Sequence, residues 1–153
     1  MITKDQVEKA QQVWGDGVVH LGSLKDQRSE LEQAVAHHVD TLYGYQLGPV
    51  LFCPTRAKEI QFRGDRAGAI SYFIGGNEAF AEDGGFALQP WTKVRFENSD
   101  LILEERRAIA MGNYFFTDTS GAETKVEYSF GYRLDDSGAL RIDLHHSALP
   151  FCG

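Results

Sequence analysis

Residues 141–150 read Arg-Ile-Asp-Leu-His-His-Ser-Ala-Leu-Pro, a run with β-strand character that ends in two histidines and a serine. Side chains on a strand alternate between its two faces, so His145 and Ser147 are expected to share one face. The opposite face is expected to carry Ile142, Leu144 and His146. The sequence therefore predicts a strand that presents an imidazole beside a hydroxyl on one side.

The sequence before this strand predicts a series of antiparallel hairpins. Short runs rich in Asp, Asn, Ser and Gly, at 98–100, 118–121 and 135–138, are typical of the turns between paired strands. The strands expected around them span residues 86–88, 92–97, 101–104 leading into 107–117, 124–134 and 140–148.

The first third of the chain has helical patterns instead. Thr3 and Gln6 form a capping-box pattern, and apolar residues follow at helical spacing to Leu21. Gly15 and Gly17 are expected to weaken or kink this helix.

A second helix is predicted over 24–43, with Gly44 as its stop. Residues 50–55 indicate a short strand or extended segment. Residues 67–73 suit a third helix, with a strand as the alternative. Helices followed by strands, with no repeat or linker, predict one α+β domain over 1–153, with N-terminal helices packed on a curved antiparallel sheet.

Composition excludes several classes of function. The chain has 153 residues and a formal net charge of −7, which argues against nucleic acid as a partner. No apolar run is long enough to span a bilayer, and the polar N-terminus lacks a signal-peptide core. We therefore expect a cytoplasmic protein without membrane contact, in which Cys53 and Cys152 are free thiols.

The histidines do not form a metal-binding pattern. His37 and His38 would be about 100° apart on a helix, as surface or partly buried residues, and His145 and His146 face opposite ways on a strand. Zinc-type cysteine spacing is absent as well. The sequence thus predicts no metal site.

Two other kinds of catalytic motif are missing. Ser147 has no Gly-x-Ser-x-Gly elbow, and no glycine-rich phosphate loop follows a strand. Aromatic residues that alternate along the expected strands are interpreted as core or dimer interface: Tyr114, Phe116, Tyr128, Phe130 and Tyr132. The polar groups left at the ends of elements are Thr55, Tyr72, His145 and Ser147. By themselves they predict only a small-molecule pocket.

A set of segments resembles one known family. They are residues 52–57 (Phe-Cys-Pro-Thr-Arg-Ala), 61–63 (Gln-Phe-Arg), 71–76 (Ser-Tyr-Phe-Ile-Gly-Gly), 82–86, 90–98 (Pro-Trp-Thr-Lys-Val-Arg-Phe-Glu-Asn), 110–118, 125–132 and the His145-His146-Ser147 ending. The chain from about Leu51 to Pro150 is similar to the iota-class carbonic anhydrases of cyanobacteria and algae. Their fold is related to the association domain of calcium/calmodulin-dependent kinase and to nuclear transport factor 2. Ala148 stands where many relatives have a second serine, a change that we expect to be tolerated.

The resemblance implies reversible hydration of carbon dioxide to bicarbonate, without metal or another cofactor. It also implies a cone-shaped, cystatin-like α+β roll and a homodimer. Carried over by motif, the catalytic hydroxyls are those of Thr55, Tyr72 and Ser147, and His145 joins them by strand alternation. Apolar side chains would line the carbon dioxide side of the pocket: Phe52, Phe73 and Tyr128.

The implied chemistry is demanding. Zinc lowers the pKa of bound water from about 15.7 to about 7, which neutral hydroxyls cannot do. We hypothesise that the hydroxyls orient one water and that its proton leaves along them. His145, whose ordinary pKa is about 6.5, is expected to accept that proton or to help orient the hydroxyls. Activity would then rise with pH.

Two other functions stay open at this point. One is a non-catalytic binding or assembly module of the same fold. The other is a different small-molecule hydratase or isomerase with an acidic or histidine general base in the pocket. Asp143 is a candidate for that base, since alternation puts it on the face of His145. We favour a structural role for Asp143, paired with an arginine.

Overall fold

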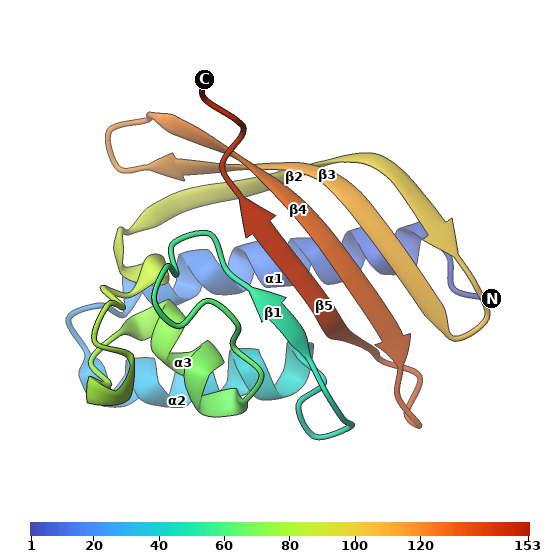
Figure 1. Ribbon diagram of the computed structural model, residues 1–153, viewed down its shortest axis with the longest axis horizontal. Helices are drawn as coiled ribbons and strands as arrows, with labels where there is room; N and C mark the ends of the chain where they lie inside the picture. Colours follow the sequence, from blue (N-terminus) through green and yellow to red (C-terminus); the bar gives the residue numbers. More distant parts are fainter.

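Four long strands and one short strand form a single sheet in the computed structural model, which describes residues 1–153. The strands are β1 (Leu51–Cys53), β2 (Trp91–Leu103), β3 (Arg107–Asp118), β4 (Glu123–Leu134) and β5 (Leu140–Ala148). Their order is β1-β5-β4-β3-β2, and every pair is antiparallel except β1 with β5, which is parallel (Figure 1). The predicted α+β class is confirmed, but the sheet is mixed because the chain enters β1 from the helical layer.

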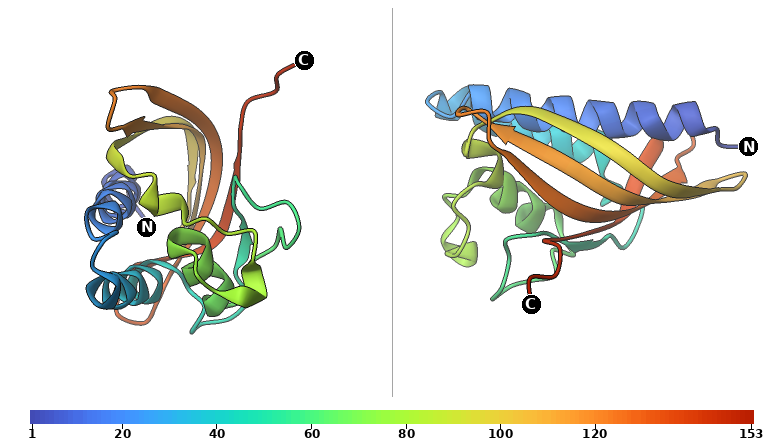
Figure 2. Two further views of the ribbon diagram at one scale, coloured as in Figure 1. Left: turned by 90° about the vertical axis from the view of Figure 1, so that its left-hand side faces the viewer. Right: turned by 90° about the horizontal axis from the view of Figure 1, so that it is seen from above.

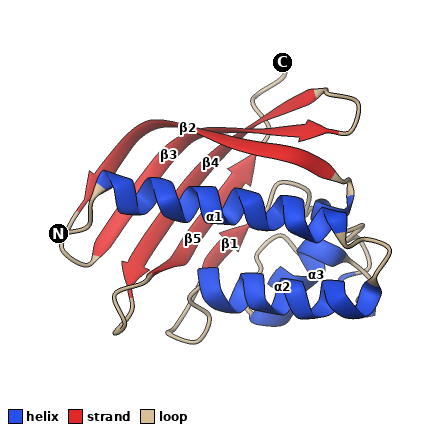
Figure 3. Cartoon of the chain, turned by 180° about the vertical axis from the view of Figure 1, so that it is seen from behind, coloured by secondary structure: helices blue, strands red, loops and turns tan.

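Three helices cover one face of this sheet: α1 (Lys4–Ser23), α2 (Arg28–Leu42) and α3 (Arg66–Ile74). The sheet curves around them, with α1 lying across the long strands and α2 and α3 beside β1 (Figures 2 and 3). The buried core lies between the two layers and is rich in aromatic residues. The other face of the sheet is free of helices.

Helix α1 begins as predicted but is not interrupted by its glycines. Thr3 and Gln6 form the expected capping box, and the helix continues to Ser23. A Cβ at Gly17 would lie 2.4 Å from Nδ1 of His38, and one at Gly15 would lie 3.1 Å from a side-chain carbon of Val94. The glycines therefore allow close contact of α1 with α2 and with the sheet, and they bury His38 more deeply than expected.

Three predicted boundaries are wrong. Helix α2 starts at Arg28, because residues 24–27 form the turn out of α1. Residues 86–88 form the short 3-10 helix η2 (Phe86–Leu88) and not a strand, while the segment at 66–74 is helical. Residues 98–100 do not turn: β2 continues through a register shift there, beside Gly112, where a Cβ would lie 2.1 Å from the Glu97 carbonyl oxygen.

Strand β5 contains a bulge that changes the predicted alternation. Tyr132 pairs with Ile142 and Gly131 pairs with Leu144, so Asp143 is the extra residue. Ile142 is therefore buried on the same side as His145, and its predicted place beside His146 is wrong. Asp143 instead forms an ion pair with Arg107, with an N–O distance of 2.7 Å, which is the structural role favoured above.

Beyond the bulge the predicted alternation holds. His145 and Ser147 both face the helical layer and are buried, while His146 is exposed on the other face. No helix of the chain is both long and apolar enough to cross a membrane.

Candidate active site

A small cavity lies between the sheet and the helices, next to the end of β5. Its volume is about 10 Å³, close to the smallest that holds one water molecule. Its polar walls are Thr55, Tyr72, Tyr114, His145 and Ser147, and its apolar walls include Phe52, Phe73 and Phe86. Of the predicted site residues, the structure thus brings together all four polar ones and two of the three aromatic ones.

Three hydroxyl groups lie in direct contact at this cavity. Ser147 Oγ is 2.5 Å from Thr55 Oγ1 and 2.6 Å from the Tyr114 hydroxyl oxygen. Thr55 follows β1, Tyr114 is on β3 and Ser147 is on β5, so the cluster depends on the parallel pairing of β1 with β5. Contacts this short make the three hydroxyls one hydrogen-bonded unit.

His145 extends this unit toward the interior. Its Nε2 is 3.0 Å from the Tyr114 hydroxyl, and its Nδ1 is 2.8 Å from the hydroxyl of Tyr43. The Tyr43 oxygen in turn accepts a 3.0 Å hydrogen bond from Nε1 of Trp14 on α1. Both ring nitrogens of His145 are therefore occupied by neutral partners.

The surroundings of His145 keep it uncharged. The imidazole is sandwiched between Phe130 and Phe52, with ring centroids 4.1 Å and 4.8 Å away. Burial, with smaller contributions from His146 and His38, lowers the pKa of His145 to about 3. The lowered pKa disfavours His145 as the acceptor of the water's proton, because desolvation disfavours the imidazolium, and it is compatible with the other expected role, orientation of the hydroxyls.

Tyr72 supplies a fourth hydroxyl from α3. Its oxygen accepts a 3.2 Å hydrogen bond from the backbone N–H of Arg56. Burial raises the pKa values of Tyr72 and Tyr114 well above that of an ordinary tyrosine. Both tyrosines are neutral at physiological pH, so the cavity contains hydroxyls and no formal charge.

The loop that carries Thr55 is fastened by the buried Arg63. The guanidinium forms two 2.7 Å hydrogen bonds to the Asp83 carboxylate, and the Arg63 backbone N–H donates to the carbonyl of Phe52. Ser71 of α3 donates to the same carboxylate over 2.6 Å. These bonds hold the loop after β1 against α3 and fix the position of Thr55.

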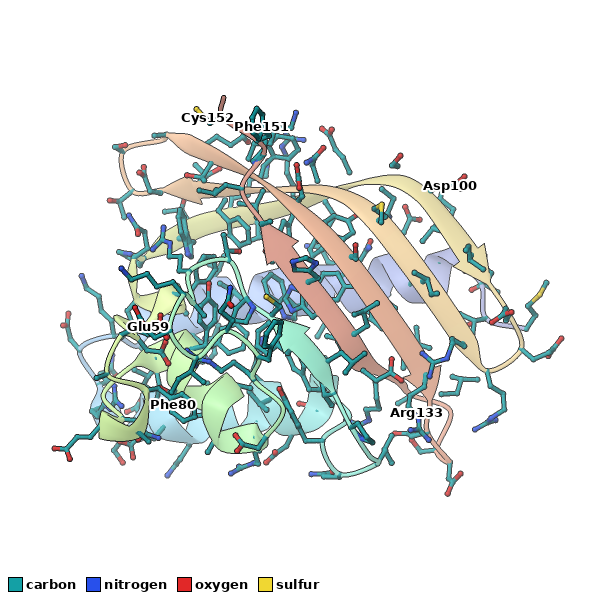
Figure 4. The ribbon with its side chains drawn as sticks, viewed as in Figure 1. Glu59, Phe80, Asp100, Arg133, Phe151 and Cys152 are labelled. Atoms are coloured by element: carbon teal, nitrogen blue, oxygen red, sulfur yellow. The ribbon has the colours of Figure 1, made fainter.

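A second anchor holds the outer part of this loop. The Glu82 carboxylate accepts hydrogen bonds from three consecutive backbone N–H groups, those of Lys58, Glu59 and Ile60. Glu59 lies on the ribbon just above the segment that carries Phe80 (Figure 4). The loop that follows segment 52–57 is thus hydrogen-bonded to segment 82–86, although the two segments lie far apart in the sequence.

Two aromatic residues make contacts that sequence patterns did not predict. Tyr128 does not line the cavity, because its hydroxyl donates to Asn98 over 2.5 Å elsewhere in the core. Tyr114 lies in the core, one of the two places predicted for it, and its hydroxyl in addition joins Ser147 to His145. Strand register was the available signal, since β3 and β5 flank β4 and their inward residues face the same layer.

The histidines, cysteines and acidic residues show no arrangement for a metal ion. No group of three or more of these side chains is placed to bind one. Cys53 and Cys152 are both free, and Cys152 lies with Phe151 at the free C-terminal end (Figure 4).

Comparison with known proteins points to one family. The model of a family described as metal-independent carbonic anhydrase matches residues 5–149. A metal-independent carbonic anhydrase from Nostoc sp. is 43% identical over 153 residues, which cover 98% of this chain and 75% of that protein.

Solved structures agree with this match. The crystal structure of a cyanobacterial iota-carbonic anhydrase complexed with bicarbonate superposes with a TM-score of 0.96 at 40% identity, covering 99% of this chain and 94% of the other. A putative calcium/calmodulin-dependent kinase II association domain from Xanthomonas campestris reaches a TM-score of 0.64 at 22% identity, over 98% and 89% of the two chains. The second likeness shows the fold alone.

Proposed function

The chain belongs to the metal-independent carbonic anhydrases and catalyses the reversible hydration of carbon dioxide to bicarbonate, and from this premise we propose that the small cavity beside Ser147 is its active site. The observation that carries the proposal is the contact of the Thr55, Ser147 and Tyr114 hydroxyls at an aromatic-walled cavity. Such a site combines an apolar wall for a nonpolar gas with hydroxyls for its hydrated product.

In this proposal the hydroxyls hold the reacting oxygens in place. Phe52, Phe73 and Phe86 form the apolar wall for carbon dioxide. The cavity of about 10 Å³ holds no more than one water, so these side chains move apart when carbon dioxide enters. The oxygen of one ordered water forms a bond to carbon, and a π electron pair moves onto a carbon dioxide oxygen. Hydroxyls of Thr55 and Tyr72 stabilise the charge that develops there. One hydrogen of the water stays in bicarbonate, and the other is released as a proton.

His145 has a positioning role in this scheme. The neutral imidazole, held between two phenyl rings, supports the Tyr114 hydroxyl and through it Ser147. Catalysis then relies on orientation and hydrogen bonding, which contribute by holding reactants in a reactive geometry.

The test is carbon dioxide hydration by metal-analysed, chelator-treated protein. Ser147→Ala and Tyr72→Phe should each lower kcat/KM by about 10²-fold, the size of the loss of a group that stabilises developing charge. Ser129→Ala is the matched control: Ser129 is on β4 opposite the exposed His146, away from the cavity. Full activity in the Ser147→Ala and Tyr72→Phe variants, with folding retained, would place the active site elsewhere.

We further propose a homodimer that forms through the uncovered face of the sheet. Exposed apolar side chains on this face support it, among them Leu51 of β1, which pairs with Leu144, and Met111 of β3, which is 59% exposed. Sedimentation equilibrium should give twice the chain mass for the wild type and one chain mass for Met111→Lys. A monomeric wild type would contradict the proposal.

The cytoplasm is the compartment that we propose for the chain. Its two cysteines are free thiols, as expected where thiols stay reduced. Fractionation of the source cells, followed by detection of the chain with an antibody, tests this. Recovery in a secreted or luminal fraction would contradict it.

A further inference from the structure

The hydrogen bonds that lead to the cavity form a single chain of six side chains. In order these are Trp14, Tyr43, His145, Tyr114, Ser147 and Thr55, with successive distances of 3.0, 2.8, 3.0, 2.6 and 2.5 Å. All of them except Tyr43 also line the cavity. Tyr43, Tyr114 and His145 are at most 2% exposed. Water cannot replace any of the internal partners, so each hydrogen along the chain has a definite place.

Trp14 determines the direction of this chain because its indole nitrogen can only donate. The Tyr43 oxygen accepts that hydrogen bond, and the only acceptor near the Tyr43 hydroxyl hydrogen is Nδ1 of His145. His145 then carries its hydrogen on Nε2 and donates it to Tyr114. The opposite tautomer would leave the buried Tyr43 hydrogen without an acceptor, which costs about 1–3 kcal/mol by the usual penalty.

The same direction continues to the cavity. Tyr114 has accepted from His145, so its hydroxyl donates to Ser147, and Ser147 in turn donates to Thr55. The Thr55 hydrogen is the last in the chain and lies at the cavity, beside the Tyr72 hydroxyl with which Thr55 interacts. Tyr72, whose oxygen accepts from the Arg56 N–H, has its own hydrogen free.

We propose that Trp14 is a positioning residue for the reaction: through Tyr43 and the Nε2–H tautomer of His145 it turns the Thr55 hydroxyl into a fixed donor toward the reacting oxygens. This inference rests on the proposed function, because it assigns a task to the same cavity. The donor points at oxygens that gain negative charge as bicarbonate forms, which is the geometry that accelerates such a reaction.

A second consequence concerns the proton that the water loses. A proton that entered at Thr55 would have to reverse every hydrogen bond and leave at the far end. That end is the Trp14 N–H, which cannot accept a proton, so the chain has no outlet. The water's proton therefore leaves the cavity by a path that excludes His145, in place of the route along the hydroxyls expected from the sequence.

The experiment reads the tautomer of His145 directly, by long-range ¹H–¹⁵N correlation spectra of the full-length, labelled protein. The wild type should show a single Nε2–H tautomer. Trp14→Phe should show a mixture of tautomers and a kcat about tenfold lower, as expected for the loss of one ordinary hydrogen bond. Trp91→Phe is the control, because its indole donates to the Phe86 carbonyl outside the chain; its His145 tautomer should be unchanged.

Tyr43→Phe tests the same step without changing the cavity wall, to which Trp14 contributes and Tyr43 does not, and it also serves if the smaller residue at position 14 impairs folding. It keeps the ring and removes the donor to Nδ1, so it should also release the tautomer and lower kcat. A wild-type protein with Nδ1–H, with both tautomers or with an imidazolium would overturn the proposal. Full kcat in a folded Trp14→Phe variant with mixed tautomers would overturn the positioning role.

The outcomes separate this inference from the proposed active site. If Ser147→Ala is inactive while wild-type His145 populates both tautomers, the site stands and the direction of the chain is refuted. A single tautomer together with a fully active Ser147→Ala variant would refute the active site, and with it the positioning role of Trp14.

Discussion

At the scale of single residues, His145 shows how surroundings decide what an ionisable group can do. The same imidazole that would exchange protons at the surface is here enclosed by Phe52 and Phe130, with both nitrogens bonded to tyrosines. A charge on this ring would have neither water nor a carboxylate to stabilise it. Its contribution is a fixed arrangement of donor and acceptor.

We predict that His145 stays neutral across the range in which carbonic anhydrases work. Since its pKa is lowered to about 3, its ¹⁵N chemical shifts should stay constant from pH 5 to pH 8, and the pH profile of kcat should show no inflection that disappears in His145→Gln. A shift of the His145 signals centred between pH 5.5 and pH 7.5 would contradict this prediction.

Tyr114 offers a prediction about a hydroxyl that sequence patterns overlooked. Tyr114→Phe keeps the ring but separates Ser147 from His145, so kcat/KM should fall at least tenfold in carbon dioxide hydration assays. The matched control is Tyr132→Phe on the neighbouring strand. The Tyr132 hydroxyl is buried without a partner, so its removal should leave activity unchanged and stability equal or higher. Equal activity losses in the two variants would refute the prediction.

At the scale of elements, close packing explains why glycines occur in the middle of a long helix. Helix propensity alone makes Gly17 unfavourable by up to about 1 kcal/mol relative to Ala. The contact with His38 reverses that preference, because a methyl group there would occupy the space of the imidazole.

Gly17→Ala should accordingly destabilise the protein by about 1–3 kcal/mol, the usual cost of overpacking. Denaturant unfolding of Gly17→Ala, His38→Leu and the double variant measures the coupling. Since the smaller, flexible leucine relieves the clash, the double variant should be more stable than the sum of the two single changes predicts. Simple additivity would show that the contact has no energetic effect.

The fastening of the Thr55 loop gives a second prediction at this scale. Asp83→Ala removes the hydrogen-bonded carboxylate of the fully buried Arg63 guanidinium and leaves it only Glu82, at an N–O distance of 3.9 Å. It should cost about 3 kcal/mol in unfolding free energy. It should also lower kcat, because Thr55 is carried by the same loop. Asp40→Ala breaks the exposed pair with Arg66 and should cost about 0–1 kcal/mol. Similar losses in the two variants would contradict a special role for the buried pair.

Local patterns predicted most elements of the fold, and they failed where two segments meet. The capping box at Thr3, the third helix and the order of the hairpins followed from the sequence alone. The register shift in β2 did not, because Asn-Ser-Asp is typical of turns and the reason for continuing is Gly112 on the partner strand. Thr55, Tyr72 and Ser147 were predictable as motifs, whereas Tyr114 required the register of the sheet.

At the scale of the whole molecule, the core between the helices and the sheet contains two uncharged histidines. His38 lies between α1 and α2, and His145 lies on the sheet; both are buried. Burial lowers the pKa of each to about 3. The Nε2 atom of His38 has no hydrogen-bond partner at all. The fold therefore opposes protonation at both positions.

These two histidines predict that the protein loses stability in mild acid. Below the ordinary pKa of about 6.5 the unfolded chain binds protons that the native state does not, so stability is complete above that pH and is lost as the pH falls toward 3. Between pH 7 and pH 5 each histidine should account for about 2 kcal/mol of lost unfolding free energy. Urea unfolding at the two pH values measures the sum, which His38→Leu should reduce by about half. An unchanged pH dependence in His38→Leu would refute the assignment.

The bulge at Asp143 shifts by one residue which positions of β5 face the interior, much as an inserted nucleotide shifts a reading frame. Ile142 and His145 both reach the interior although three positions separate them, because one residue is counted out of the alternation. The two halves of β5 therefore alternate in different phases: Ile142 of one packs in the general core, and His145 and Ser147 of the other line the proposed active site. Deleting Asp143 would merge the phases, so that either Ile142 or His145 must turn to solvent. One extra residue thus allows a single strand to supply side chains both to the general core and to the proposed active site.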